Sequence, residues 1–328
     1  MTSSAPDPTF ADPPELAHAI AHMLGGGDPE GSARLEAQLV ALFHSAPPGQ
    51  VRGFFRQLAE SGGRWGYEPP HPLGQRLSEL VLSDRLEQGS KLANATALDQ
   101  VGERPMVFVG NHLSFVDANV LAHLLARSGH EQLARRLCVI VGPKVFSKPV
   151  RRVATLCFGT VKTPQSVSRA SGAARMSARE VARFAARSLA AAHERLDAGD
   201  ALLIFVEGSR SRSGTMQRAL TGVARYLKRP ELLVVPFGLA GSEQLTPIAS
   251  AEFLYRTQVH ARVGQPFTAA SLRRCSSRRP SLMMDVVGFC IAACLPPGYR
   301  GVYDGSHAEL AEARELSGGL VDRELKDT

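Results

Sequence analysis

The stretch MVFVGNHLSFVD, residues 106–117, decides how the rest of the chain is interpreted. Its first four residues are a short apolar run typical of a buried strand, and Gly110 and Asn111 mark the start of a loop. His112 and Asp117 follow, five residues apart. A carboxylate at that spacing can bind one imidazole nitrogen, which fixes the tautomer and leaves the other nitrogen as a general base for an alcohol. The spacing also fits a loop histidine beside an aspartate that caps a helix.

A second apolar run, Leu202–Val206, opens into the loop EGSRSRSG, residues 207–214. Two guanidinium forks, three hydroxyls and flanking glycines suit a phosphate, because a guanidinium matches phosphate oxygens and glycine lets the backbone approach. The glycine spacing is not that of a nucleotide-binding phosphate loop. The loop therefore predicts an anion site, with a solvated basic loop as the alternative.

The remaining pattern alternates between strands and helices. Three more apolar runs predict strands at Leu137–Val141, Leu232–Leu239 and Val259–Val263. Helical spacing of apolar residues predicts helices at Ser177–Leu196, Thr215–Lys228 and Ser281–Leu295, the last of them as core. Strands that alternate with helices indicate an α/β fold in which helices cover both faces of a sheet.

The chain divides into four parts by composition. Residues 1–14 are rich in proline, serine and aspartate, and we expect a disordered tail. Residues 15–89 carry apolar residues at helical spacing between glycines and prolines, which predicts an N-terminal helical segment. Residues 90–303 hold the strands and both motifs. Residues 304–328 are a charged C-terminal tail that we expect to fray.

Charge and apolar content limit the possible partners. The net charge of +7 over 328 residues favours an anionic partner, which is a nucleic acid, an acidic membrane surface or a phosphorylated substrate. Nucleic acid is disfavoured, because one Trp and five Tyr offer few stacking platforms and no DNA-binding or RNA-binding motif is present. No apolar run reaches the roughly 20 residues that span a bilayer, and the N-terminus lacks a signal-peptide pattern. We therefore expect a cytoplasmic protein.

The five cysteines lack the paired spacing of metal ligands. Cys138, Cys157, Cys275, Cys290 and Cys294 are expected to be reduced and mostly buried, and no metal site is predicted.

Together, NHLSFVD and FVEGSRSRSG resemble the first and third sequence blocks of the glycerol-phosphate and lysophospholipid acyltransferase family. They stand in the family's order, about 95 residues apart. Val235-Pro236-Phe237 is similar to the fourth block, and Lys144 resembles the lysine that opens the second. The resemblance covers residues 90–303.

The resemblance implies a fold and a set of roles. The fold would be a central mixed, largely parallel sheet flanked by helices. His112 would remove the proton from the acceptor hydroxyl, and Asp117 would hold the imidazole. Arg210 would bind the acceptor phosphate. The other implied substrate-binding residues are Lys144, Lys162, Glu207, Gly208, Ser209 and Arg212.

The implied activity is transfer of a fatty acyl group from acyl-CoA or acyl carrier protein to 1-acylglycerol-3-phosphate, without a cofactor, by a protein peripheral to the inner face of the membrane. One departure keeps the acceptor open. The family's second block often ends in an Asp-Arg or Arg-Arg pair, whereas this chain offers only Lys162. Glycerol 3-phosphate or another lysolipid is therefore an alternative acceptor, and a catalytically silent lipid-binding relative is a third hypothesis. Arg273, Arg274, Arg278 and Arg279 form either a contact for anionic lipid or a solvated loop.

Overall fold

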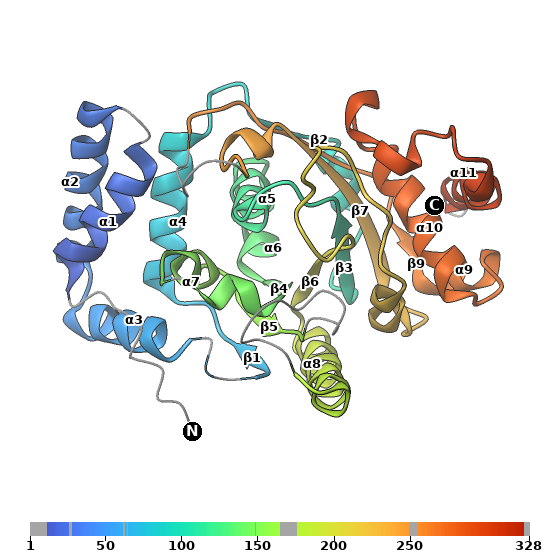
Figure 1. Cartoon of the computed structure of the whole chain (residues 1–328), viewed down its shortest axis with the longest axis horizontal. Helices are drawn as coiled ribbons and strands as arrows, with labels where there is room; N and C mark the ends of the chain where they lie inside the picture. The colour runs from blue at the N-terminus through green and yellow to red at the C-terminus, as the bar shows by residue number, and fades with distance from the viewer. Residues whose placement is uncertain are drawn as a thin grey trace.

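The computed structural model describes residues 12–25, 28–61, 63, 65–147, 149–164, 176–248 and 255–324. A sheet lies at the centre, with the N-terminal helices beside one of its edges and the C-terminal helices on the opposite side of the molecule (Figure 1). The predicted disordered tail, residues 1–14, falls outside the described residues except at its end, where Pro13 begins the first helix.

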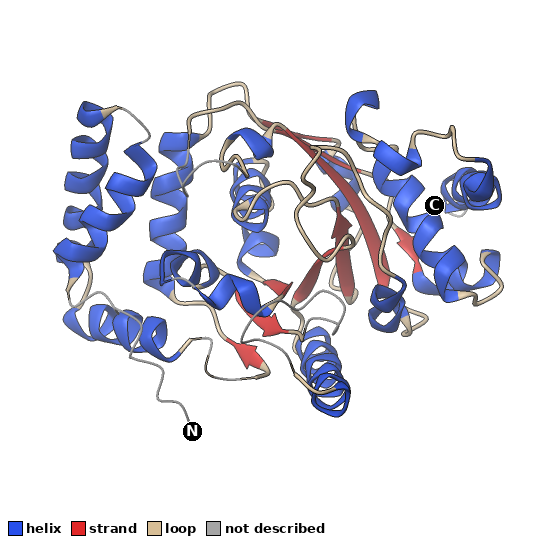
Figure 2. Ribbon diagram, viewed as in Figure 1, coloured by secondary structure: helices blue, strands red, loops and turns tan. Residues whose placement is uncertain are grey.

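The described residues form a nine-stranded sheet (Figure 2). Its strands are β1 (Tyr67–Glu68), β2 (Lys91–Ala93), β3 (Met106–Gly110), β4 (Leu137–Val141), β5 (Gly159–Lys162), β6 (Ala201–Phe205), β7 (Leu233–Ala240), β8 (His260–Val263) and β9 (Phe267–Thr268). Their order is β1-β5-β4-β6-β3-β7-β8-β2, and β9 pairs with β7. All five predicted strands are present within a residue or two of the expected bounds.

The centre of the sheet is parallel and its margins are mixed. Strands β5, β4, β6, β3 and β7 run parallel to one another. Strand β1 pairs antiparallel with β5, strands β8 and β9 pair antiparallel with β7, and β2 pairs parallel with β8. The expected mixed, largely parallel sheet is confirmed. The short strands β1 and β2, which form the two edges, and β5 and β9 were not expected from the sequence.

Helices cover both faces, as the alternation of β3 side chains requires. Val107 and Val109 pack with α8 (Ala178–Asp197), α9 (Ala269–Cys275), α10 (Pro280–Ala292) and α11 (Ala311–Glu324). Met106 and Phe108 pack on the other face with α5 (Asp117–Arg127) and α6 (Glu131–Arg135). Helix α10 is buried along its length, as expected of the segment Ser281–Leu295.

The N-terminal segment is helical, as expected. It contains α1 (Pro13–Gly25), α2 (Pro29–Ser45), α3 (Pro48–Glu60) and α4 (Pro72–Arg85). Helices α2, α3 and α4 each begin with a proline. Proline lacks a backbone N–H, but the first N–H groups of a helix form no hydrogen bond within it, so no bond is lost. Leu35, Leu39, Phe54 and Leu58 form a separate core, which also takes in Val153 of α7 (Pro149–Thr155). The described part of this segment is therefore docked on the sheet domain through α4 and α7.

The helix expected at Thr215–Lys228 is wrong. Residues 216–220 form neither a helix nor a strand, and the segment that follows, η4 (Thr221–Leu227), is a 3₁₀ helix. The backbone donors of this segment bind tertiary partners instead of one another. The N–H of Met216 donates to the carbonyl of Tyr299, that of Leu220 to Val206, and that of Gln217 to the Glu207 carboxylate. Those bonds replace the i to i−4 bonds that the apolar spacing predicts.

The expectation that the chain frays after Tyr303 is also wrong for the described part of that region. Residues 311–324 form α11, and Leu310, Ala313 and Leu320 are buried against the core that contains α10. Glu312, Arg314 and Glu315, which contribute to the charge that suggested a tail, are exposed on that helix. Among the described residues, no helix combines the length and apolar character needed to cross a bilayer.

Candidate active site

The loop after β3 begins at the centre of the sheet, between β6 and β7. Its entry is tightly packed, since a Cβ at Gly110 would lie 2.3 Å from the ring of Phe237. The Asn111 side chain then binds the backbone of Leu239 twice. Its amide donates to the Leu239 carbonyl at 2.9 Å, and its oxygen accepts from the Leu239 N–H at 2.8 Å. These contacts fix the direction in which residue 112 leaves the sheet.

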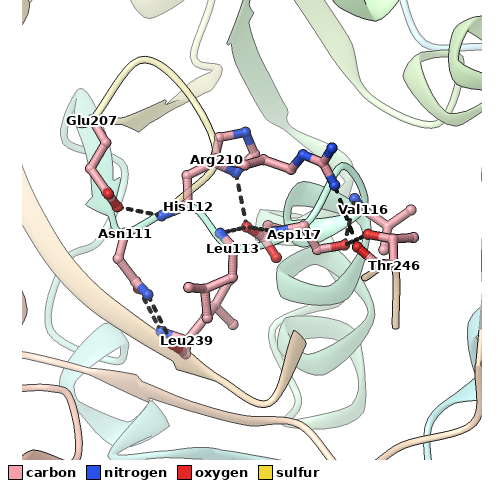
Figure 3. Close-up of polar contacts among 10 residues, drawn as sticks. Asn111, His112, Leu113, Val116, Asp117, Glu207, Arg210, Leu239 and Thr246 are labelled. Atoms are coloured by element: carbon pink, nitrogen blue, oxygen red, sulfur yellow. Dashed lines mark hydrogen bonds and ion pairs between the residues drawn. The ribbon is translucent and has the colours of Figure 1, made fainter. Parts of the chain in front are cut away.

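His112 and Asp117 form the expected pair (Figure 3). Asp117 is fully buried in the first turn of α5, and its Oδ2 accepts from His112 Nδ1 at 2.9 Å, Leu113 N at 2.6 Å and Ser114 N at 2.9 Å. The carboxylate thus braces the loop before the helix and orients the imidazole, and it does not cap α5, which has no side-chain cap among the described residues. Because an ionised carboxylate only accepts hydrogen bonds, Nδ1 carries the proton and Nε2 of the neutral ring is an acceptor.

The imidazole is held on one of its faces as well. The ring of Phe205, the last residue of β6, stacks on it with centroids 4.3 Å apart and an interplanar angle of 16°. The side chain of His112 is 18 % exposed. The ring therefore has little freedom to rotate and faces its surroundings mainly through its edge.

Glu207 supports His112 from the neighbouring loop. Its Oε1 accepts from the backbone N–H of His112 at 2.8 Å, and its Oε2 from that of Gln217 at 2.9 Å. Burial of the carboxyl group raises the pKa of Glu207 to about 7, although the two backbone bonds oppose the shift. Glu207 thus joins the loop after β3 to the loop after β6.

A cavity of about 560 Å³ opens beside His112, near the carboxyl ends of β4 and β6. Its volume falls in the range of small-molecule sites. The wall is mainly apolar and is contributed by α5, β4, β6, α8 and η4. Its members include Phe115, Ile140, Phe158, Val181, Ala185, Leu189, Phe205, Val223 and Tyr226.

Arg210 lies close to the loop that holds His112 and Asp117. Its guanidinium carbon is 3.4 Å from the centroid of the Phe115 ring, and Nη1 donates to the Thr246 carbonyl at 3.4 Å (Figure 3). The Thr246 hydroxyl is in turn 2.6 Å from that of Ser114. Arg210 is thereby held against Phe115, which lies three residues after His112 and lines the cavity.

The other predicted binding residues occupy different positions. Gly208 lines the cavity with a φ of +66°, a conformation that favours glycine. Ser209 and Arg212 are exposed on the same loop, and Lys144 is exposed in the turn after β4. Lys162 is buried outside the cavity wall defined by the described residues. Its ammonium lies 4.8 Å from the Trp65 ring and 5.1 Å from the Phe146 ring, and burial lowers its pKa.

Phe115, Phe205 and Arg151, whose guanidinium carbon lies 3.9 Å from the centroid of the Phe115 ring, were not singled out from the sequence. Phe115 stands inside the first motif, in the loop after β3, and Phe205 ends β6 directly before the second motif, so their closeness to the motifs was the signal available. Arg151 follows Pro149 in α7, and only its charge in that region could have drawn notice.

Neither the cysteines nor a metal cluster contributes to this site. All five thiols are free, and four of them are buried, as expected. Burial raises the pKa of the Cys157 thiol to about 12, so it stays protonated. Across the described ranges, no group of three His, Cys, Asp or Glu side chains is placed to share a metal ion.

Comparison with known proteins bears on the whole arrangement. Residues 88–240 match the Acyltransferase family model, and this range contains His112, Asp117, Glu207 and Arg210. No curated protein matches the sequence. The crystal structure of the 1-acyl-sn-glycerophosphate (LPA) acyltransferase PlsC from Thermotoga maritima is similar over 95 % of this chain and 94 % of that chain, with 14 % identity and a TM-score of 0.43. By this match, the segment of residues 88–240 is similar to the Acyltransferase family.

Proposed function

We propose that this acyltransferase transfers a fatty acyl group from acyl-CoA or acyl carrier protein to the hydroxyl of 1-acylglycerol-3-phosphate. The observation that carries the proposal is the position of His112, which is bound to a buried carboxylate and lines a mainly apolar cavity. An apolar cavity of this size suits an acyl chain, and a base at its wall suits activation of an alcohol.

In the proposed reaction, His112 Nε2 takes the proton of the acceptor hydroxyl while that oxygen attacks the thioester carbonyl. The resulting imidazolium is stabilised by Asp117, which the Nδ1 bond already places. Collapse of the tetrahedral intermediate breaks the carbon–sulfur bond, and the imidazolium returns its proton to the leaving thiolate. An ester and a free thiol are the products, without a covalent enzyme intermediate.

Arg210 would bind the acceptor phosphate. The Phe115 ring and the Thr246 carbonyl hold its guanidinium close to the catalytic loop. Binding the phosphate at a fixed place orients the hydroxyl toward the thioester, which converts binding energy into rate.

We also propose that the protein works in the cytoplasm, peripheral to the inner face of the membrane. Supporting this, α8 presents the exposed arginines Arg179, Arg183 and Arg187 at four-residue spacing, while Val181, Ala185 and Leu189 of the same helix line the cavity. A basic surface beside an apolar cavity suits anionic headgroups. The positive charge of the arginine cluster at residues 273–279, the other candidate contact for anionic lipid, is partly neutralised, because Arg279 forms an ion pair with Glu312.

The test is a thiol-release assay with mass analysis of the product. Acyl-CoA and acyl carrier protein are each offered with 1-acylglycerol-3-phosphate, glycerol 3-phosphate and neutral lysolipids. Wild type should release thiol and form phosphatidate, and His112→Ala should lose about 10³-fold or more in turnover. Equal turnover by His112→Ala would exclude the proposed base. A different acylated product would change the acceptor, release without an acceptor would indicate a thioesterase, and no release at all would indicate a silent lipid-binding protein.

A further inference from the structure

Two guanidinium groups contact the ring of Phe115. The guanidinium carbon of Arg210 lies 3.4 Å from the ring centroid, and that of Arg151 lies 3.9 Å from the same centroid. Arg210 comes from the loop after β6, and Arg151 comes from α7. Two cations from distant parts of the sequence thus share one aromatic ring, three residues after His112.

From this geometry we infer that Arg151 is a second ligand of the acceptor phosphate and works with Arg210 as a two-arginine clamp for a phosphate monoester. The inference rests on the proposed function and deepens it, since it names a group that selects the acceptor. The chemical class is a dianionic phosphate monoester on a glycerol backbone.

The charge arrangement favours a bound dianion. Two guanidinium groups repel each other when they are gathered near one ring, and a doubly charged ligand reverses that repulsion. A planar guanidinium can form bidentate hydrogen bonds with phosphate oxygens, and its contact with an aromatic ring is compatible with them. Phe115 also lines the cavity, so the clamp is next to the place proposed for the acyl chain.

Arg151 also accounts for the departure in the second sequence block. Lys162, the cation that remained there, is buried among the Trp65 and Phe146 rings and outside the cavity wall. Arg151 is half-buried, and its Nη1 donates to the Lys144 carbonyl at 3.4 Å, which ties α7 to the turn after β4. The second sequence block ends at Lys162, which does not reach the cavity wall formed by the described residues. In this chain, Arg151 of α7 therefore supplies the second positive charge beside Arg210.

The experiment measures KM for acceptor and donor separately in Arg151→Gln. The expected result is a rise of about 10-fold to 100-fold in KM for 1-acylglycerol-3-phosphate, the range for loss of hydrogen bonds to a charged group. The KM for acyl donor and the melting temperature should stay at wild-type values. Arg151→Lys should fall between the two, because an ammonium keeps the charge but lacks the planar fork.

The matched control is Arg135→Gln, which removes an exposed arginine from α6 and should leave both KM values unchanged. An unchanged acceptor KM in an active Arg151→Gln enzyme would overturn the inference and leave the proposed function standing. Equal losses toward donor and acceptor in both Arg151 variants would make the residue structural and also overturn it. A wild-type protein that acylates no phosphate-bearing acceptor would remove the proposed function and the inference together.

Discussion

A single carboxylate oxygen organises the loop that holds His112. Asp117 Oδ2 accepts three donors, two from the backbone of the loop that precedes α5, at Leu113 and Ser114, and one from the His112 ring. Asp117 Oδ1, the other oxygen, is buried with no hydrogen-bond partner among the described residues. The loop geometry and the imidazole orientation therefore depend on the same atom. A substitution of Asp117 leaves the loop intact only if the new side chain keeps a hydrogen-bond acceptor at the position of Oδ2.

Asp117→Asn keeps such an acceptor. Its amide oxygen can take the three donors, while the negative charge that stabilises the imidazolium is lost. We expect kcat to fall by about 10³-fold to 10⁴-fold, with the free energy of unfolding lowered by no more than about 2 kcal/mol. Steady-state kinetics and urea unfolding measure the two effects. Asp117→Ala should lose both activity and stability, and a near-normal kcat in the Asn variant would show that the charge has no role.

Glu207 gives stability a defined dependence on pH. Burial raises its pKa from 4.5 to about 7, so between these values the folded protein holds a proton that the unfolded chain releases. The free energy of unfolding therefore falls as pH rises through this window, by up to about 3 kcal/mol. Urea unfolding of wild type and Glu207→Gln from pH 5 to pH 8 measures this dependence. The variant should lack it, because glutamine does not titrate. A difference between them that stays constant with pH would contradict it.

At the scale of elements, the sequence predicted the ends of β3 and β6 correctly but predicted the wrong structure for residues 216–220. The runs before His112 and Glu207 are continuous apolar stretches between glycine-rich loops, so strand and loop were both readable. Residues 216–220 have helical spacing, yet their N–H groups bind Tyr299, Val206 and Glu207. Those partners are close only after folding, which is why local periodicity predicted a helix there.

The inward face of α8 sets the space available to the acyl chain under the proposed function. Ala185 lines the cavity, whereas its neighbour Ala186 is exposed. Ala185→Phe should lower kcat/KM for palmitoyl-CoA relative to octanoyl-CoA by roughly tenfold, since overpacking costs about 1–3 kcal/mol. Ala186→Phe is the matched control and should leave that ratio unchanged. If both variants keep the wild-type ratio, the acyl chain lies elsewhere.

Across the whole molecule, the sequence predicted the parallel centre and missed the parts that depend on long-range contact. Strands β1 and β9 are only two residues long, and the short β2 is recognised by its pairing with β8. The charge of residues 304–328 suggested a tail, because the buried apolar residues described there, Leu310, Ala313 and Leu320, are widely spaced and give a weak apolar pattern. The same limit applies to Arg151, whose place beside Phe115 follows from the docking of α7.

Helix α11 should stabilise the core as a whole. Leu320 is 3 % exposed and belongs to the core that includes α10, so Leu320→Ala should lower the free energy of unfolding by about 2–4 kcal/mol. Glu315→Ala, at an exposed position of the same helix, should change it by less than about 0.5 kcal/mol. Urea unfolding at equilibrium measures both. A Leu320 variant as stable as wild type would mean that the helix is loosely attached.

The edges of the sheet limit how this domain can be cut. The family match spans residues 88–240, but β1, which pairs with β5, and β8, which pairs with both β7 and β2, lie outside it. A fragment trimmed to the match would present bare backbone donors and acceptors along β5 and β7, and β2 would have no partner. Unpaired margins of this kind recruit other chains, so the trimmed fragment is a poor choice for expression and invites aggregation. The flanking segments cover the edges of this sheet and so keep it from pairing with other copies of the chain.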